Sequence, residues 1–147
     1  IDGDFPAYVE RVDLEALFEQ SDIVSLHVPL NDETRGMVDT RLLGRMRTGS
    51  MLVNTARGAV VDIDAVLARL SDDTLDGVAL DVLPVEPLAP SHPLARHPRV
   101  LLTPHSAFYS TAAEVELRRK AALNIVQWAT TGRPRYPVVQ GTKSPAG

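Results

Sequence analysis

Four short apolar runs constrain the fold of this chain more than any other feature of its sequence. Each run is followed at once by polar or turn-forming residues, and the stretches between runs are long enough for a helix or an ordinary loop. The runs lie at residues 23–26, 51–53, 78–80 and 100–102. Short, continuous apolar runs are typical of parallel strands whose two faces are both covered. The sequence therefore predicts an α/β fold built on a parallel sheet.

Capping residues and amphipathic patterns predict the helices around these runs. Asp13 and Asp62 each precede an amphipathic pattern, as an N-cap does. Thr111 and Glu114 have the spacing of a capping box, and Gly132 is placed to end the helix that they begin. The expected strands are 22–27, 50–54, 76–81 and 99–103. Four helices are expected: one that begins near residue 13, one over 39–47, one that follows Asp62, and one over 111–131. Residues 83–98 hold five of the eleven prolines and are expected to form an extended loop.

Composition narrows the classes of partner that the chain can bind. Its 147 residues include no cysteine, which excludes disulfides, thiolate metal sites and a cysteine nucleophile, and which fits a reducing cytoplasm. The net charge of -4 argues against a general surface for nucleic acid or anionic membrane. No apolar stretch approaches the roughly 20 residues of a membrane span. We therefore expect a cytoplasmic protein that binds neither nucleic acid directly nor a membrane.

Three side chains that are far apart in the sequence come after three different runs. Because the carboxyl ends of parallel strands line one crevice, Arg57, Glu86 and His105 are expected to converge on one rim. An imidazole exchanges a proton near neutral pH, and a carboxylate beside it stabilises the imidazolium and fixes the tautomer. A guanidinium binds a carboxylate through two parallel hydrogen bonds. Taken singly, His105 could cap a helix or be exposed, Glu86 could be a solvated loop residue, and Arg57 could form a surface ion pair.

Other polar residues have two interpretations that the sequence leaves open. Asp81 could accept hydrogen bonds from an amide group of a ligand, or it could be a turn or N-cap residue. Thr34 could hold a ribose or phosphate, or it could cap its own turn. His27 is expected to end a strand, and His92 and His97 to lie in solvated loops. The histidines have no metal-ligand spacing, so no metal site is predicted.

Four segments, taken together, resemble the D-isomer-specific 2-hydroxyacid dehydrogenase family. They are Ser21–Leu30, Leu52–Gly58, Gly77–Pro87 and Leu102–Ala107. The resemblance extends over about residues 10–135, and four motifs in the right order make it far more specific than a single short pattern. Residues 105–110 look most similar to the branch that contains the C-terminal-binding-protein corepressors and their bacterial relatives.

The resemblance implies a Rossmann-type fold and a reaction in which NAD(H) exchanges a hydride with C2 of a 2-oxo or 2-hydroxy acid of D configuration. By this resemblance Arg57 would hold the substrate carboxylate, His105 would be the acid and base, and Glu86 would orient His105. A positioned acid and a cation suit this chemistry, because hydride delivery leaves negative charge on oxygen. The residues implied to contact the dinucleotide are Val28, Pro29, Leu30, Thr34, Thr55, Ala56, Arg57, Asp81, His105, Ser106, Ala107 and Phe108.

One part of the family pattern is absent from these 147 residues. The chain contains no G-x-G-x-x-G, the loop that binds the pyrophosphate of a dinucleotide. The resemblance then implies that residues 1–109 are the C-terminal part of a dinucleotide-binding domain. Residues 110–147 would be a helix and tail that join the substrate domain of a longer, homodimeric protein. We expect the segment alone to bind NAD weakly and to turn over poorly.

Two classes of function follow from the resemblance. The leading hypothesis is an enzyme, or the catalytic part of one, that acts on a small 2-oxo or 2-hydroxy acid. The alternative is an NAD(H)-sensing, corepressor-like binding protein whose turnover is incidental or absent, and a third is a non-catalytic fragment. The sequence leaves open which acid is used and whether the cofactor is NAD or NADP.

Overall fold

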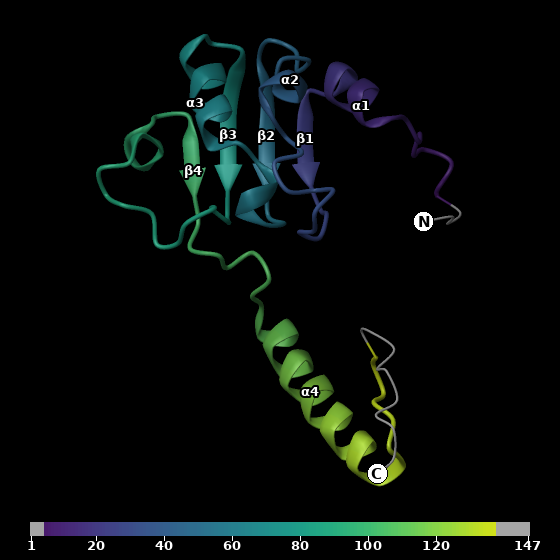
Figure 1. The fold of residues 1–147 in the computed structure, drawn as a ribbon. Coiled ribbons are helices and arrows are strands. Elements are labelled where there is room, and N and C mark those ends of the chain that lie inside the picture. The colour runs from purple at the N-terminus through teal and green to yellow at the C-terminus, as the bar shows by residue number, and fades with distance from the viewer. Residues whose placement is uncertain (1–4, 138–147) are drawn as a thin grey trace. The chain divides into compact units, whose positions relative to one another are not determined.

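A four-stranded parallel sheet is the central feature of the computed structural model, which describes residues 5–137. The strands are β1 (Ile23–Leu26), β2 (Ser50–Asn54), β3 (Leu75–Leu80) and β4 (Val100–Leu102), and they are ordered β1-β2-β3-β4 (Figure 1). Every neighbouring pair is parallel. The predicted α/β fold is confirmed, and each strand begins and ends within a residue of its predicted bounds.

An aspartate is the N-cap of each of the three α-helices that pack against the sheet. These helices are α1 (Leu14–Gln20), α2 (Thr40–Leu43) and α3 (Ile63–Ser71). The side chains of Asp13, Asp39 and Asp62 accept hydrogen bonds from backbone N–H groups in the first turns, which satisfies donors that a helix start leaves unpaired. The predicted caps at Asp13 and Asp62 are confirmed.

The second helix is shorter than the predicted 39–47. It ends at Leu43, where Gly44 follows as the C-cap. The backbone N–H groups of Arg45 and Met46 then donate to carbonyls three residues earlier, so the chain continues in tighter turns. Met46 still enters the core and is 4% exposed. Apolar periodicity therefore identified the buried side chains correctly but did not show where the α-helix gives way to turns.

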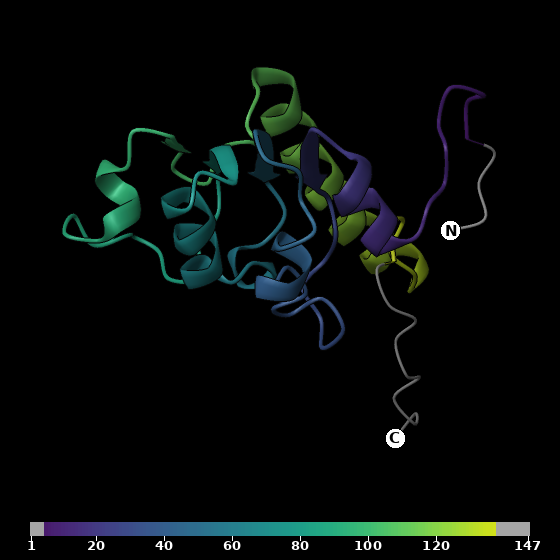
Figure 2. The same ribbon diagram turned by 90° about the horizontal axis from the view of Figure 1, so that it is seen from above.

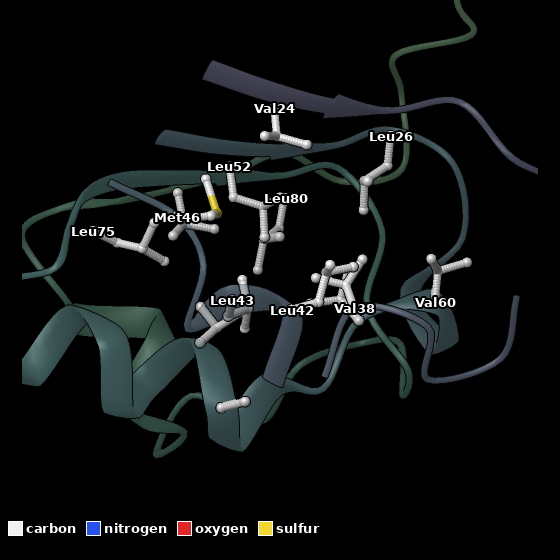
Figure 3. Close-up of a cluster of buried hydrophobic side chains, with 14 of the residues drawn as sticks. Val24, Leu26, Val38, Leu42, Leu43, Met46, Leu52, Val60, Leu75 and Leu80 are labelled. Atoms are coloured by element: carbon white, nitrogen blue, oxygen red, sulfur yellow. The ribbon is translucent and has the colours of Figure 1, made fainter. Parts of the chain in front are cut away.

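Helices α1, α2 and α3 all lie on one side of the strands, as the view from above shows (Figure 2). Leu42 and Leu43 of α2 point toward Leu52 and Leu80 of the sheet, and all four side chains are fully or almost fully buried (Figure 3). Burial of a leucine side chain stabilises a fold by about 1.5–3 kcal/mol. This single apolar layer holds the sheet and its loops in place.

The opposite face of the sheet is not covered within residues 5–107. Ile23, Met51 and Leu101 point to that face and are 59%, 41% and 63% exposed. The expectation that the strands are covered on both faces is therefore wrong for this part of the chain. The positions on the open face are nevertheless apolar or small. Together with the buried positions between them, they form a continuous apolar run in the sequence. Such a run does not reveal which face of the sheet has a partner.

The loops hold two short 3-10 helices that were not predicted. One, η1 (Gly58–Val60), follows β2, and the other, η2 (Pro93–Arg96), lies in the proline-rich segment. The expectation of an extended loop over 83–98 is thus wrong at η2. Proline fits the first turn of a helix because its fixed φ is already helical and its missing N–H needs no partner. His92 caps this turn by accepting from the N–H of Leu94.

Residues 108–137 form a separate unit that contains one long helix, α4 (Thr111–Thr131). Ser110 is its N-cap and accepts from the N–H of Ala113, so the predicted capping box at Thr111 and Glu114 is wrong. Glu114 instead contacts Tyr109 and Arg118. Gly132 ends the helix at φ 70°, as predicted, because glycine adopts this left-handed conformation without penalty. No helix found in residues 5–137 is both long enough and apolar enough to cross a membrane.

The cap of α3 gives a test of the fold. Asp62→Ala removes the acceptor for the N–H groups of Asp64 and Ala65, and should lower the free energy of unfolding by about 0.5–2 kcal/mol. Asp64→Ala is the matched control, because Asp64 lies in the same turn without capping it. Denaturant unfolding of both variants should show the larger loss for Asp62→Ala, and equal losses would contradict the capping role.

Candidate active site

The strands β1 to β4 end in one row, so the loops that follow them begin at the same edge of the sheet. The register pairs Asn54, the last residue of β2, with Leu80 of β3, and pairs Leu80 with Leu102 of β4. The ladder continues one step further, because Asp81 N–H donates to Asn54 and Thr103 N–H donates to Leu80. The loops after β2, β3 and β4 therefore meet, as expected for the carboxyl ends of parallel strands.

Arg57, Glu86 and His105 come together at this edge. All three line one cavity of about 250 Å³, although each follows a different strand. Its full lining is Leu30, Arg57, Gly58, Ala59, Val82, Leu83, Pro84, Glu86 and His105. A larger cavity of about 570 Å³, with mostly apolar walls, lies against the same Glu86 and His105. Glu86 and His105 therefore line both the cavity that contains the Arg57 guanidinium and the larger, mostly apolar one.

Glu86 and His105 form a hydrogen-bonded pair. Nδ1 of His105 lies 2.9 Å from Oε2 of Glu86, and Oε1 of Glu86 accepts from the backbone N–H of Leu83 at 2.7 Å. The Leu83 N–H and the His105 ring together hold the pKa of Glu86 below its ordinary value. Glu86 is therefore ionised at neutral pH and accepts the proton on Nδ1. Nε2 is then the ring nitrogen that can exchange a proton with a ligand.

The backbone of His105 adopts the left-handed region, with φ at 53°. Its N–H donates to the carbonyl oxygens of Asp81 at 2.9 Å and Thr103 at 3.0 Å. The carboxylate of Asp81 also holds this loop, since it accepts from the Thr103 hydroxyl and from the N–H groups of Ser106 and Ala107, both at 2.9 Å. A non-glycine residue in this conformation costs free energy and persists where surrounding bonds enforce it. Asp81 supplies those bonds.

The charge state of Asp81 follows from these contacts. Only 6% of its surface is exposed, and burial by itself raises the pKa of a carboxyl group. Hydrogen bonds from Thr103, Ala107 and Ser106 act in the opposite direction and outweigh burial, so the pKa of Asp81 lies below its ordinary value. Asp81 is therefore a buried, ionised group whose carboxylate accepts three hydrogen bonds from the loop of His105.

Arg57 is positioned by a turn that the buried Asn54 closes. Asn54 accepts from the N–H of Ala56 at 3.0 Å and donates to the carbonyl of Arg57 at 3.1 Å. The guanidinium donates to the Ala56 carbonyl through Nη1. Among residues 5–137, no carboxylate forms an ion pair with Arg57. The guanidinium can therefore bind an anionic ligand that enters the cavity.

The loop after β1 brings Leu30 to the same cavity. Thr34 holds this loop, because its hydroxyl donates to the Pro29 carbonyl at 2.6 Å and accepts from the Asn31 N–H at 2.9 Å. It thus makes the bonds of a turn cap, which was one of its two predicted roles. Val28 is half-buried and Pro29 exposed on this loop. Thr55 and Ala56 follow β2, and Ser106 and Ala107 follow His105.

The remaining histidines lie outside this cavity. The His27 ring hydrogen-bonds to Ser25 of β1, next to the strand end where it was predicted. His92 and His97 are half-buried, rather than fully solvated, because each ring accepts from a backbone N–H two residues ahead. Within residues 5–137, no three His, Asp or Glu side chains are arranged to hold a metal ion.

Two residues that sequence reasoning missed are Asn54 and Thr103. Each is the polar residue at or just after a strand end, and each bonds to a loop that carries a candidate functional side chain. Their position at strand ends was a signal that could have identified them. Their hydrogen-bond partners could not be predicted, because a hydroxyl or amide at such a position can bond to several different loops.

The chain resembles proteins of one family over most of its length. Residues 4–107 match the family model described as D-isomer specific 2-hydroxyacid dehydrogenase, NAD binding domain. A glyoxylate reductase of Thermofilum pendens is 42% identical over 118 residues, which are 80% of this chain and 35% of that protein. A D-3-phosphoglycerate dehydrogenase of Haemophilus influenzae is 37% identical over 81% of this chain and 30% of that protein. The chain thus spans about a third of the length of these relatives.

Solved structures match the fold of this chain. The TT0316 protein of Thermus thermophilus matches with a TM-score of 0.85 and 36% identity, over 94% of this chain and 44% of that one. An acyclic imino acid reductase in complex with NADPH and D-Arg matches with a TM-score of 0.83 and 29% identity, over 92% of this chain and 43% of that one.

The hydrogen bonds of Asp81 predict a pH-dependent stability. Asp81→Asn replaces one acceptor oxygen by an NH₂ group that faces backbone N–H donors, and should lower the free energy of unfolding by about 1–3 kcal/mol at neutral pH. A carboxyl whose pKa is lowered by folding contributes stability above its ordinary pKa of about 3.9, and this contribution is lost as pH falls through the folded-state pKa. The difference between wild type and variant should therefore shrink in acid.

Denaturant unfolding across a pH series measures this difference. The matched control is Asp76→Asn, which changes an exposed aspartate of β3, the strand that Asp81 follows, and should have little effect at any pH. A loss for Asp81→Asn that stays constant from neutral pH into acid would contradict an ionised Asp81 in the folded protein.

Proposed function

The chain belongs to the D-isomer specific 2-hydroxyacid dehydrogenase family, and we therefore propose that it carries the catalytic residues of an NAD(H)-dependent enzyme. The reaction is the reduction of a small 2-oxo acid to the D-2-hydroxy acid, and its reverse. The observation that supports this most directly is the cavity shared by a guanidinium, a carboxylate and an imidazole from three strand ends.

Arg57 is proposed to bind the carboxylate of the substrate. The cavity offers a guanidinium without an ion-pair partner among the described residues, and its two-pronged geometry matches a carboxylate. A neighbouring carbonyl at C2 would then lie within the field of this cation, which favours the negative charge that develops on its oxygen during reduction.

His105 is proposed to be the acid and base. Bound NADH supplies the hydride that reduces C2. His105 gives the proton on Nε2 to the carbonyl oxygen, so that 2-oxo acid, NADH and one proton become 2-hydroxy acid and NAD⁺. In the reverse direction Nε2 takes the hydroxyl proton. Glu86 fixes the proton on Nδ1 and balances the charge of the imidazolium.

Part of a dinucleotide fits the residues that are present. Oδ2 of Asp81 accepts from Ala107 N–H and retains a second lone pair, which suits an amide donor such as that of nicotinamide. We propose that Asp81 holds this end, helped by residues of the loops after β1, β2 and β4. These further residues are Val28, Pro29, Leu30, Thr34, Thr55, Ala56, Ser106 and Ala107.

The pyrophosphate end needs residues that this chain does not contain, since it has no G-x-G-x-x-G. We propose that residues 1–109 act as the C-terminal part of a dinucleotide-binding domain and 110–147 as the connection to a substrate domain, in a homodimer. The matched share of about 35% of a curated relative supports this division.

An assay of NAD(P)H oxidation tests the proposal. The protein is produced as its gene encodes it, its intact mass is measured, and pyruvate, glyoxylate, hydroxypyruvate and bulkier aromatic 2-oxo acids are compared. Turnover of one of these acids to the D-hydroxy acid supports the enzyme. Tight binding of NADH without turnover of any of them would instead favour the sensing protein suggested by the corepressor-like segment, which stays a prediction.

Arg57→Ala tests the central residue. Loss of two charge-assisted hydrogen bonds should reduce kcat/KM for the 2-oxo acid by about 10²-fold or more. NADH binding, followed by fluorescence titration, should be largely spared. Arg96→Ala, at an exposed arginine of η2, is the control and should keep both values. An Arg57→Ala enzyme with unchanged kcat/KM would rule out the proposed carboxylate site.

A further inference from the structure

We infer that Gly58, together with Asn54, positions Arg57 across the cavity from Glu86 and His105, an inference that rests on the proposed function. Neither residue contacts the reacting atoms. Each acts through the loop that carries Arg57, Gly58 by the space it leaves and Asn54 by its hydrogen bonds.

Gly58 is the point where the loop after β2 meets the loop after β3 backbone to backbone. A Cβ atom on Gly58 would lie 1.9 Å from the carbonyl carbon of Leu83, 2.2 Å from its oxygen and 2.4 Å from the nitrogen of Pro84. No side-chain rotation can relieve such an overlap, because all three atoms belong to the backbone. Any larger residue at this position must push the two loops apart.

The contact joins the two sides of the cavity through a short series of bonds. Gly58 is covalently next to Arg57 on one side. On the other side Leu83 donates its N–H to Glu86, and Glu86 holds the ring of His105. The spacing between the guanidinium and the acid–base pair is therefore set where Gly58 touches Leu83. A misplacement of about 1 Å in such a site can reduce the rate by about 10²-fold.

The loop of Arg57 cannot move by itself to admit a side chain. Asn54, which is fully buried, holds the carbonyl of Arg57 and the N–H of Ala56. Beyond Gly58, the carbonyl of Val60 accepts from the N–H of Val38, and the N–H of Gly36 donates to Ala59. The segment is thus anchored on both sides of Gly58. A larger residue at position 58 would therefore displace the backbone of Leu83 and Pro84.

The test is Gly58→Ala in the protein as its gene encodes it. We expect kcat/KM for the 2-oxo acid to fall by about 10–10²-fold, mainly through a higher KM, while NADH binding is retained. In an Arg57→Ala background the same substitution should cause a much smaller further loss, because the guanidinium whose distance from the acid–base pair it changes is gone. A purely structural role would give additive losses, which would overturn the inference.

Gly49→Ala is the control. Gly49 has φ 86° and lies just before β2, at the end of the sheet away from the cavity, with no atom within 4 Å of the added Cβ. Alanine there strains the backbone and should lower Tm by a few degrees without changing kcat/KM. A fall in kcat/KM for Gly49→Ala as large as for Gly58→Ala would show a general loss of stability instead.

Asn54→Ala is the second test variant, to be used if Gly58→Ala does not fold. It removes both bonds that hold the Arg57 turn and introduces no overlap, so it should raise KM in the same way and cause little further loss in an Arg57→Ala background. Unchanged kcat/KM in Asn54→Ala would overturn the inference. A wild-type protein without 2-oxo acid reduction would instead contradict the proposed function, and so the two failures are distinguishable.

Discussion

Parallel pairing in a common register holds the functional loops of this protein at one level. Asn54, Leu80 and Leu102 are paired across the sheet as the last residues of β2, β3 and β4. Three loops therefore begin at one edge, and residues nearly 50 positions apart in the sequence can line one cavity of about 250 Å³. The buried layer under α1, α2 and α3 holds the strands in this register, since a shift along any strand would move its apolar side chains out of that layer.

Hydrogen bonds to polar side chains then fix the conformations of these loops. Asn54, Asp81 and Glu86 each accept a hydrogen bond from a backbone N–H in their own or a neighbouring loop. For Asp81 and Glu86 these bonds also keep the pKa low, so the groups are charged where they act. Positioning and charge thus have the same cause, because backbone N–H groups both hold a carboxylate and favour its ionised form.

The local elements could be predicted from the sequence to the extent that they depend on neighbouring residues. Asp13, Asp62 and Gly132 mark helix ends because capping is a matter of a few adjacent residues. The bounds predicted for α4, 111–131, were correct, but its predicted capping box was wrong, because Ser110 and Thr111 are both suitable caps and only backbone geometry chooses between them. Within residues 5–107 the expectation that both faces of the sheet are covered was also wrong, because an apolar side chain does not reveal whether a partner lies against it.

Sequence alone was enough to establish the strands, their parallel arrangement and the expectation that Arg57, Glu86 and His105 share one edge, because strand length, apolar pattern and strand-end residues are local or follow from topology. The folded structure was needed to show how these groups are held. The His105 backbone at φ 53°, the four hydrogen bonds that Asp81 accepts and the contact of Gly58 with Leu83 all join different loops. Such contacts depend on distances between segments far apart in the chain, which no single stretch of sequence specifies.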